Sequence, residues 1–212
     1  MDLFFKYSIV FQFLTGIVPL LILFVYKRKI RLELVVFLLA SVITTLILFI
    51  TGLYSIKNWF FFNLFSVINL TCMSVFYFSI LHSKISKVIV LIITTICAMA
   101  IILELTYYDV INLSFPILKL GITLFTFIYF LDKLANKNQS NTPAYNIINT
   151  ALCIYNCFSI FMSLEMEIML KNNFWLIHNV LEGTSKLLIA YAILKLPKMD
   201  DVIKRESLGV NP

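Results

Sequence analysis

Seven apolar stretches, each about as long as a membrane-spanning helix, take up most of this 212-residue sequence. A helix crosses the hydrocarbon core of a bilayer with roughly 20 mainly apolar residues. Stretches of this kind cover residues 7–26, 32–54, 59–81, 87–107, 112–131, 148–170 and 174–196. The sequence therefore predicts an all-α, polytopic membrane protein. Its single seven-helix transmembrane domain would occupy residues 1–196, and residues 197–212 would form a short cytoplasmic tail.

Basic residues gather in every second connection between these stretches, and this asymmetry predicts the orientation. Cytoplasmic loops of membrane proteins carry the excess of Lys and Arg. The segments on one side hold only Lys6, Lys57 and Lys171. The segments on the other side hold Lys27, Arg28, Lys29, Arg31, Lys84, Lys87, Lys133, Lys137, Lys195, Lys198, Lys204 and Arg205. We expect a multi-pass protein of the inner (plasma) membrane, with its N-terminus outside and its C-terminus in the cytoplasm.

Composition excludes several other classes of protein. With 61% hydrophobic and 13% charged residues, the chain is too apolar for a soluble globular domain. The net charge of +6 does not indicate nucleic-acid binding, because the basic residues stand at span ends, where they contact anionic lipid. The first apolar stretch lacks a small-residue cleavage site and is followed by a basic cluster, so we expect it to be retained.

The connections leave little room for catalytic machinery. The sequence contains no Gly-rich phosphate loop, no Gly-x-Ser-x-Gly elbow and no His-Glu-x-x-His pair. The longest connection, Asp132 to Ile147, is polar and is interpreted as a flexible cytoplasmic loop. We expect no enzymatic activity and no cofactor, and any signal would have to pass to a separate cytoplasmic protein.

Polar and ionisable residues inside the apolar stretches are the candidate site. Such residues are costly in lipid and need a partner or a hydrated cavity. His178, Glu182 and Lys186 follow each other at i,i+4 and share one helix face. The hairpin of the last two helices would place Glu165 level with Asn179, and Glu167 level with His178. The predicted ligand-binding residues, all toward the outer half of the bundle, are Lys119, Glu165, Glu167, His178, Asn179, Glu182 and Lys186.

Counted with Glu104, four glutamates face two lysines in these spans, which favours a small cationic ligand or a proton. The leading hypothesis is a receptor-like sensor, in which ligand binding biases helix packing and His178 acts as a pH switch. The alternative has no functional site: Glu182 and Lys186 form a purely structural ion pair, while the carboxylates of Glu104 and Glu167 are hydrated at the outer membrane surface.

Three further functions stay open. A small-solute or proton-coupled transporter would use the same acids, with Lys186 and Asn156 as an inward relay. A lysine in the seventh helix, four residues after an acid, resembles the retinal attachment site of microbial rhodopsins, although the third span, Trp59 to Leu81, lacks their Arg. A metal site at Glu165, His178 and Glu182 is conceivable. The four cysteines, Cys72, Cys97, Cys153 and Cys157, lie inside apolar spans, and no Cys-x-x-Cys motif or nearby His accompanies them, so no metal is expected.

The stretch Trp175–Leu181, with Lys186 shortly after it, carries a resemblance to a known group. Together with Asn58, Trp59 and Asn63 at the start of the third helix, it resembles short seven-helix membrane proteins of Bacteroidota that are often found near sensor histidine kinases. The resemblance covers nearly the whole chain in helix number and length. It implies a sensory or regulatory role in the membrane.

Overall fold

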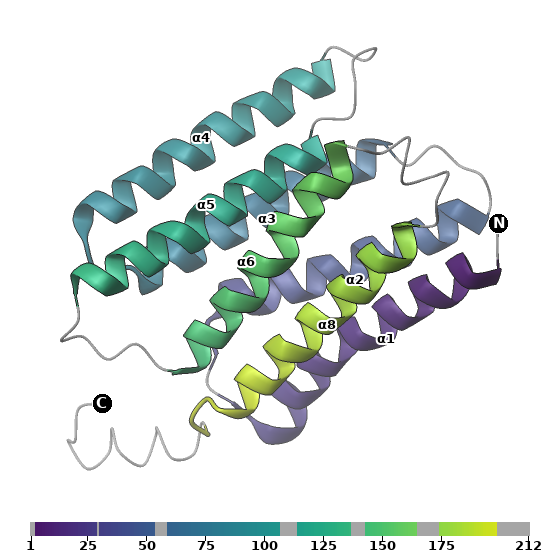
Figure 1. Ribbon diagram of the computed structural model, residues 1–212, viewed down its shortest axis with the longest axis horizontal. Coiled ribbons are helices and arrows are strands. Elements are labelled where there is room, and N and C mark those ends of the chain that lie inside the picture. Colours follow the sequence, from purple (N-terminus) through teal and green to yellow (C-terminus); the bar gives the residue numbers. More distant parts are fainter. Residues whose placement is uncertain are drawn as a thin grey trace.

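The computed structural model describes residues 3–28, 30–53, 59–106, 114–136, 143–164 and 174–198. These residues form seven helices and no strand, with the two chain ends at opposite ends of the bundle (Figure 1). The helices are α1 (Leu3–Tyr26), α2 (Leu32–Leu53), α3 (Trp59–Ile80), α4 (Lys84–Thr106), α5 (Ser114–Ala135), α6 (Pro143–Leu164) and α8 (Phe174–Leu194). The prediction of an all-α fold is confirmed.

Three of these helices are both long and apolar enough to cross a membrane, within the described part of the chain. They contain the windows Tyr7–Tyr26, Leu32–Thr51 and Lys84–Glu104, in α1, α2 and α4. The remaining helices are of similar length, but α5, α6 and α8 carry the lysines, amides and acid of the candidate site. Association with a membrane is therefore supported by three helices, and a count of seven spans stays a prediction.

The connection expected from Asp132 to Ile147 is much shorter than predicted. Helix α5 continues to Ala135, and α6 begins at Pro143 rather than at residue 148. Proline suits the first position of a helix, because its missing N–H would have no helical partner there. The interpretation of residues 132–135 and 143–147 as a flexible loop is therefore wrong, and residues 137–142 lie outside the described part.

Asp132 anchors the last turn of α5 to the connection between α3 and α4. Its carboxylate accepts hydrogen bonds from the backbone N–H groups of His82 (2.8 Å) and Ser83 (3.0 Å), and from the Ser86 hydroxyl (2.9 Å). Asp132 lies beyond the predicted span at 112–131. Burial raises the pKa of its carboxyl, but the two N–H groups and the hydroxyl outweigh burial and hold that pKa below its usual value.

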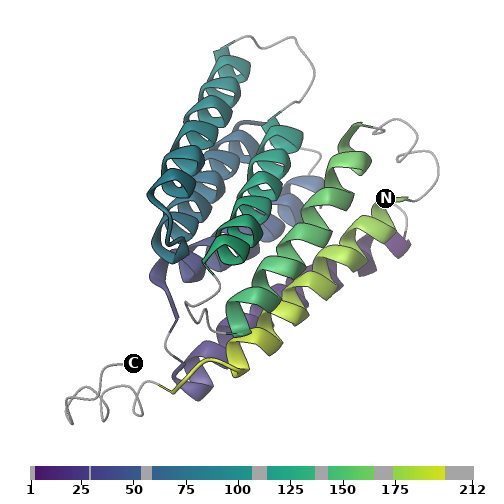
Figure 2. The same ribbon diagram turned by 60° about the vertical axis from the view of Figure 1, so that its left-hand side comes forward.

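Six helices form a closed ring. Around it, α1 packs against α2, α2 against α3, α3 against α5, α5 against α6, α6 against α8, and α8 against α1. Helix α4 stands outside this ring and contacts only α3 and α5 among the described helices. Figure 2 shows α4 at the edge of the bundle and α6 beside α8. The interior of the ring is therefore enclosed on all sides by helices.

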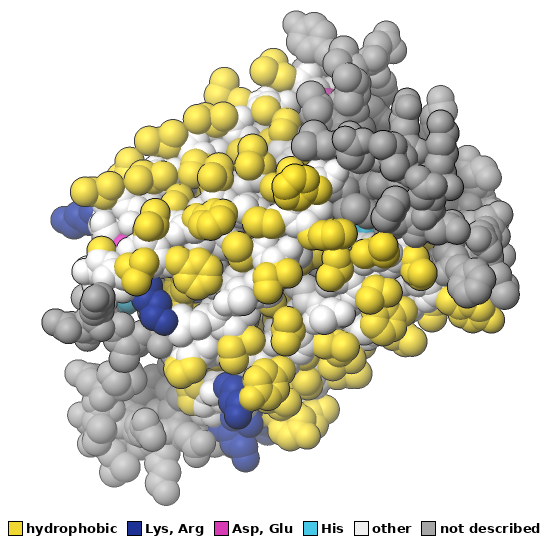
Figure 3. All heavy atoms as spheres, viewed as in Figure 1, with side chains coloured by type: hydrophobic (Ala, Val, Ile, Leu, Met, Phe, Trp, Pro, Cys, Tyr) yellow, Lys and Arg dark blue, Asp and Glu magenta, His cyan; other side chains and the backbone are white. Residues whose placement is uncertain are grey.

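One end of the ring is filled by an apolar and aromatic core. We call it the basic end, because the exposed lysines and arginines in Figure 3 lie there, at the end of the bundle where α8 ends. Leu34, Phe76, Tyr77 and Tyr129 are almost completely buried in this core. The Tyr77 hydroxyl donates to Asn149 Oδ1 at 2.5 Å, so this buried hydroxyl has a hydrogen-bond partner within the core. The core leaves the basic end of the ring closed by packed side chains.

Small residues let α1 and α8 approach each other closely. A Cβ atom at Gly183 would lie 2.4 Å from Cε1 of Phe11 and 3.0 Å from Oγ1 of Thr15, so no larger residue fits without movement. At the basic end, Arg28 Nη1 donates to the carbonyl oxygen of Leu196 at 2.6 Å, which ties the end of α8 to the α1–α2 connection. Helix α8 is thereby held against α1 along its length.

Candidate functional site

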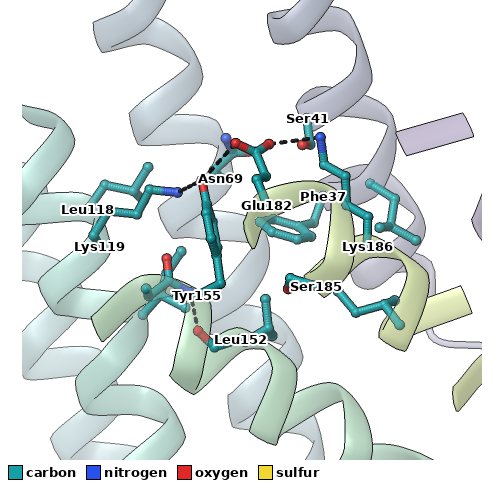
Figure 4. A pocket seen from close by; sticks show the side chains of 14 residues that line it. Phe37, Ser41, Asn69, Leu118, Lys119, Leu152, Tyr155, Glu182, Ser185 and Lys186 are labelled. Carbon is teal, nitrogen blue, oxygen red and sulfur yellow. Dashed lines mark hydrogen bonds and ion pairs between the residues drawn. The ribbon is translucent and has the colours of Figure 1, made fainter. Parts of the chain in front are cut away.

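Four side chains from three helices form a continuous polar chain inside the ring. Lys119 Nζ donates to the Tyr155 hydroxyl at 3.0 Å, and that hydroxyl donates to Glu182 Oε2 at 2.8 Å. On the other carboxylate oxygen, Lys186 Nζ forms an ion pair at 2.7 Å (Figure 4). Lys119 Nζ also lies 4.2 Å from the centre of the Tyr155 ring, within the range of a cation–π interaction. We call these four residues the polar chain.

Local helix geometry explains how the polar chain is assembled. Glu182 and Lys186 are one turn apart on α8, in the order that favours an intrahelical ion pair. Tyr155 projects from α6 toward Glu182, and Lys119 reaches the same hydroxyl from α5. At 1.5 Å per residue, Lys119 lies ~8 Å and Lys186 ~18 Å along their helices from the end opposite the basic end. The polar chain thus extends from the end of the ring opposite the aromatic core to about the middle of the bundle.

A small cavity adjoins the polar chain. Its volume is about 50 Å³, and its polar lining includes Ser41, Asn69, Asn156 and Ser185 besides the polar chain. One water needs about 10–15 Å³ of such volume, so a few waters or one very small solute would fit. Pockets for drug-sized ligands measure roughly 300–1,000 Å³. In this state the cavity is too small for a molecule such as retinal.

Two amide oxygens in the cavity lining have no hydrogen-bond partner among the described residues. They are Oδ1 of Asn69 and Oδ1 of Asn156. Asn156 is only 1% exposed, and its Nδ2 donates to the Leu152 carbonyl at 2.7 Å, which fixes the oxygen as the group left over. A buried acceptor without a partner costs about 1–3 kcal/mol. The cavity therefore favours an occupant that donates hydrogen bonds, and water is the simplest one.

The charge balance expected from the sequence can be compared with the described residues only in part. Two lysines and one glutamate line it. Glu104 is on α4, outside the ring, while Glu165 and Glu167 lie outside the described residues. Within the described part of the chain, one carboxylate and two lysines therefore line the cavity, and the excess of acid stays a prediction.

The structure places only some of the seven predicted site residues at the cavity. Lys119, Glu182 and Lys186 line the cavity. His178 is buried beside Tyr155, with ring centres 5.6 Å apart, and its Nε2 lies 3.1 Å from Ser159 Oγ. Asn179 points away from the cavity and donates to Ser8 Oγ on α1 at 2.8 Å.

The register of α6 against α8 differs from the predicted hairpin. Ser159 lies opposite His178, and Tyr155 lies opposite Glu182. The predicted alignment of residue 165 with Asn179 would have placed the partners about two helical turns further along α6. The connection that sets this register, residues 165–173, lies outside the described part of the chain.

The sequence analysis did not identify Tyr155. Its hydroxyl links Lys119 to Glu182, and Glu182 in turn pairs with Lys186. Asn69 and Ser41, which line the cavity from α3 and α2, were not identified either. Tyr155 and Ser159 are one turn apart on α6 and both face α8, which is the signal that could have indicated this face.

No group of three or more His, Cys, Asp or Glu side chains that could hold a metal ion is found among the described residues. The four cysteines are free thiols. Comparison with known protein families, with curated proteins and with solved structures finds no match. The function has to be argued from the geometry of the polar chain and its cavity.

Proposed function

We propose that this chain is a receptor-like sensor of the inner membrane. Seven helices cross the bilayer, with the N-terminus outside and the basic end in the cytoplasm. The polar chain and its cavity take up a proton or a very small solute from outside. The resulting change in helix packing is passed to a separate cytoplasmic protein, and the chain itself catalyses no reaction.

The observation that carries this proposal is the enclosed polar chain. Charged groups inside a membrane bundle are expensive, and apolar side chains of similar volume often give equal or greater stability. Lys119, Glu182 and Lys186 nevertheless meet inside a closed ring, next to a cavity with unsatisfied amide oxygens. Packing alone gives no reason for this arrangement, whereas binding of a proton or small solute does.

The packed core at the basic end supports a sensor more than a channel. Leu34, Phe76, Tyr77 and Tyr129 close the ring between the cavity and the basic end. A stimulus that binds one state of the polar chain more tightly shifts the packing of the helices that carry it. Helix α8 links the two regions directly, because it holds Glu182 and Lys186 and ends at the Arg28–Leu196 contact.

Thermal unfolding of the purified protein in lipid nanodiscs would test the proposal. We expect pH, or one of a panel of sodium, potassium, ammonium and short-chain amines, to shift the Tm. The Glu182→Gln variant should lose this shift. Glu33→Gln is the matched control, because Glu33 stands in the first turn of α2, outside the cavity lining. A Tm that stays constant across all pH values and solutes would contradict the proposal.

A transporter is the second candidate, and the closed ring favours it. The cavity lies inside a ring of six helices, which is where an alternating pathway would run. Transport requires the aromatic core at the basic end to open, whereas sensing does not. Flux of protons or of the stabilising solute into proteoliposomes would identify a transporter, and a sensor should give none.

Binding of retinal or of a metal is less well supported. Lys186 is held by Glu182 at 2.7 Å, beside a cavity of about 50 Å³, which leaves no space for a long polyene. Of the metal ligands suggested by the sequence, His178 lies against Ser159, and Glu165 is outside the described residues.

A further inference from the structure

We propose that the cavity binds a compact, uncharged molecule that both donates and accepts hydrogen bonds, of the chemical class of the smallest primary amides. This inference rests on the proposed function and names the class of solute that the sensor takes up. It follows from the hydrogen-bonding groups left open in the cavity lining, from their arrangement across the ring, and from the size of the cavity.

The cavity presents two hydrogen-bond acceptors to an occupant. Oδ1 of Asn69 on α3 and Oδ1 of Asn156 on α6 are buried, and neither has a partner among the described residues. The Nδ2 of Asn156 donates to the Leu152 carbonyl at 2.7 Å, so the amide is oriented with its oxygen left for the cavity. Burying such oxygens without a donor destabilises the fold. An occupant with more than one N–H or O–H group removes this cost.

The cavity also presents a hydrogen-bond donor. Lys186 Nζ on α8 is buried and pairs with Glu182 at 2.7 Å, and it makes no further hydrogen bond among the described residues. Because an ammonium group carries several N–H donors, this ion pair leaves N–H groups for an occupant that offers an acceptor. The cavity therefore matches a molecule that has N–H donors and a carbonyl acceptor, which is the pattern of a primary amide.

The two open oxygens come from helices that are not neighbours in the ring, yet they lie at nearly the same level. Nearer the basic end, α3 and α6 are joined by the hydrogen bond from the Tyr77 hydroxyl to Asn149 Oδ1. At about 1.5 Å per residue, Asn69 lies about 12 Å from Tyr77 along α3, and Asn156 lies about 10 Å from Asn149 along α6, both away from the basic end. A molecule bonded to both oxygens therefore adds a second bridge between α3 and α6, and its binding stabilises the packing in which they are bridged.

The size and the apolar wall of the cavity favour one such molecule over a group of waters. The volume of about 50 Å³ has room for a few waters, which together are about as large as formamide. Phe37, Ile122 and Ile189 form part of the wall and offer water no side-chain hydrogen bond. Each ordered water also loses entropy. A single amide makes the same hydrogen bonds and places its C–H side against the apolar wall.

An ion of the same size is a poorer occupant. A cation needs a carboxylate, and Glu182 is the only acid among the described residues that line the cavity. One of its oxygens is already paired with Lys186, and the other accepts from Tyr155. An anion such as formate has no N–H or O–H group, so it leaves the oxygens of Asn69 and Asn156 without a donor and places negative charge beside them. The uncharged amide meets neither difficulty.

Binding of formamide to the whole protein in lipid nanodiscs would test the assignment. Saturation-transfer NMR, with empty nanodiscs as the blank, detects weakly bound formamide through its formyl C–H signal. The affinity limit for a ligand of so few atoms places the Kd at about 1 mM or weaker. Acetonitrile is of similar size but has only an acceptor, so we expect it to bind roughly tenfold more weakly. Formate and formamidinium, the anionic and cationic analogues, should also bind more weakly, and butyramide should be too large.

Alanine variants would locate the binding groups. Asn156→Ala and Asn69→Ala each remove one acceptor without filling the cavity, so each should raise the Kd for formamide roughly three- to tenfold, the effect of one hydrogen bond. Two variants on different helices keep the test valid if one of them does not fold. Asn179→Ala is the matched control, because Asn179 is a buried amide that donates to Ser8 and does not line the cavity. It should bind formamide as tightly as the wild type.

The outcomes separate the assignment from the broader proposal. No saturation transfer to formamide in the wild type would mean that the cavity holds water only, and would overturn the assignment. Equal Kd values in the wild type and both alanine variants would overturn it too, as would tighter binding of acetonitrile, formate or formamidinium than of formamide. The sensor proposal survives each of these results where pH or another solute shifts the Tm and Glu182→Gln removes that shift. A Tm insensitive to pH and to every solute, formamide included, would refute both.

Discussion

Replacement of the single carboxylate of the polar chain should be far more damaging than replacement of its outer lysine. Glu182→Gln keeps the size of the side chain but removes the carboxylate that pairs with Lys186 at 2.7 Å and accepts the hydrogen bond of the Tyr155 hydroxyl. Breaking a buried ion pair by removing one partner typically costs about 3–5 kcal/mol. We expect a loss of this size in the free energy of unfolding, reduced to the extent that a lysine gives up its proton.

Lys119→Met provides the matched comparison. It removes one hydrogen bond, worth about 1 kcal/mol, and a cation–π contact worth roughly 0.5–2 kcal/mol. It also removes a buried ammonium group, and burial of an ion costs several kcal/mol. These contributions nearly cancel, so the variant should unfold within about 1 kcal/mol of the wild type.

Denaturant unfolding of both variants in mixed micelles, at a pH where the wild type unfolds reversibly, would measure the difference. The reasoning would be refuted if Lys119→Met were as destabilised as Glu182→Gln. That result would mean that the stability of the fold depends as much on Lys119 as on the ion pair between Glu182 and Lys186.

Three further predictions concern the rest of the fold. Gly183→Ala should destabilise the protein by about 1–3 kcal/mol through the clash with Phe11, despite the better helix propensity of alanine, as chemical denaturation would show. Tyr77→Phe leaves Asn149 Oδ1 without its donor in the core, and should cost about 1–3 kcal/mol in the same assay. The lowered pKa of Asp132 means that its carboxylate adds stability above the unfolded pKa of about 3.9, and that this stability is lost as pH falls through the lower folded pKa. Asp132→Asn should abolish this acid-dependent part of the unfolding curve, and an unchanged curve would contradict the proposed role of its hydrogen bonds.

The helices were predictable because their signal is local. Long apolar runs interrupted by polar connections indicate both the number and the approximate ends of the helices, and six of the seven helix starts fall within a few residues of the predicted ones. The exception, α6, begins five residues early at Pro143. Hydropathy marked these first residues as polar, whereas proline favours a helix start whatever the polarity of its neighbours.

The site was predictable only in part, because its assembly depends on how each helix is rotated. Lys119, Glu182 and Lys186 were identified from the cost of burying charge, which needs no knowledge of neighbours. Tyr155 was not, since one tyrosine among ten carries no such signal until its contact with Glu182 is known. The register of α6 against α8 was also out of reach, because the length of a connection does not fix it.

The order of helices around the ring has a mechanical consequence. Two pairs of neighbours run in the same direction, α3 beside α5 and α8 beside α1, and they divide the bundle into the halves α1–α3 and α5–α8. Every charged residue of the cavity belongs to the second half, and the first contributes only neutral groups such as Ser41 and Asn69. A separation of the halves along these two seams would therefore break no ion pair of the cavity. The charged residues of the cavity would move together, and at the cavity water would replace only neutral contacts.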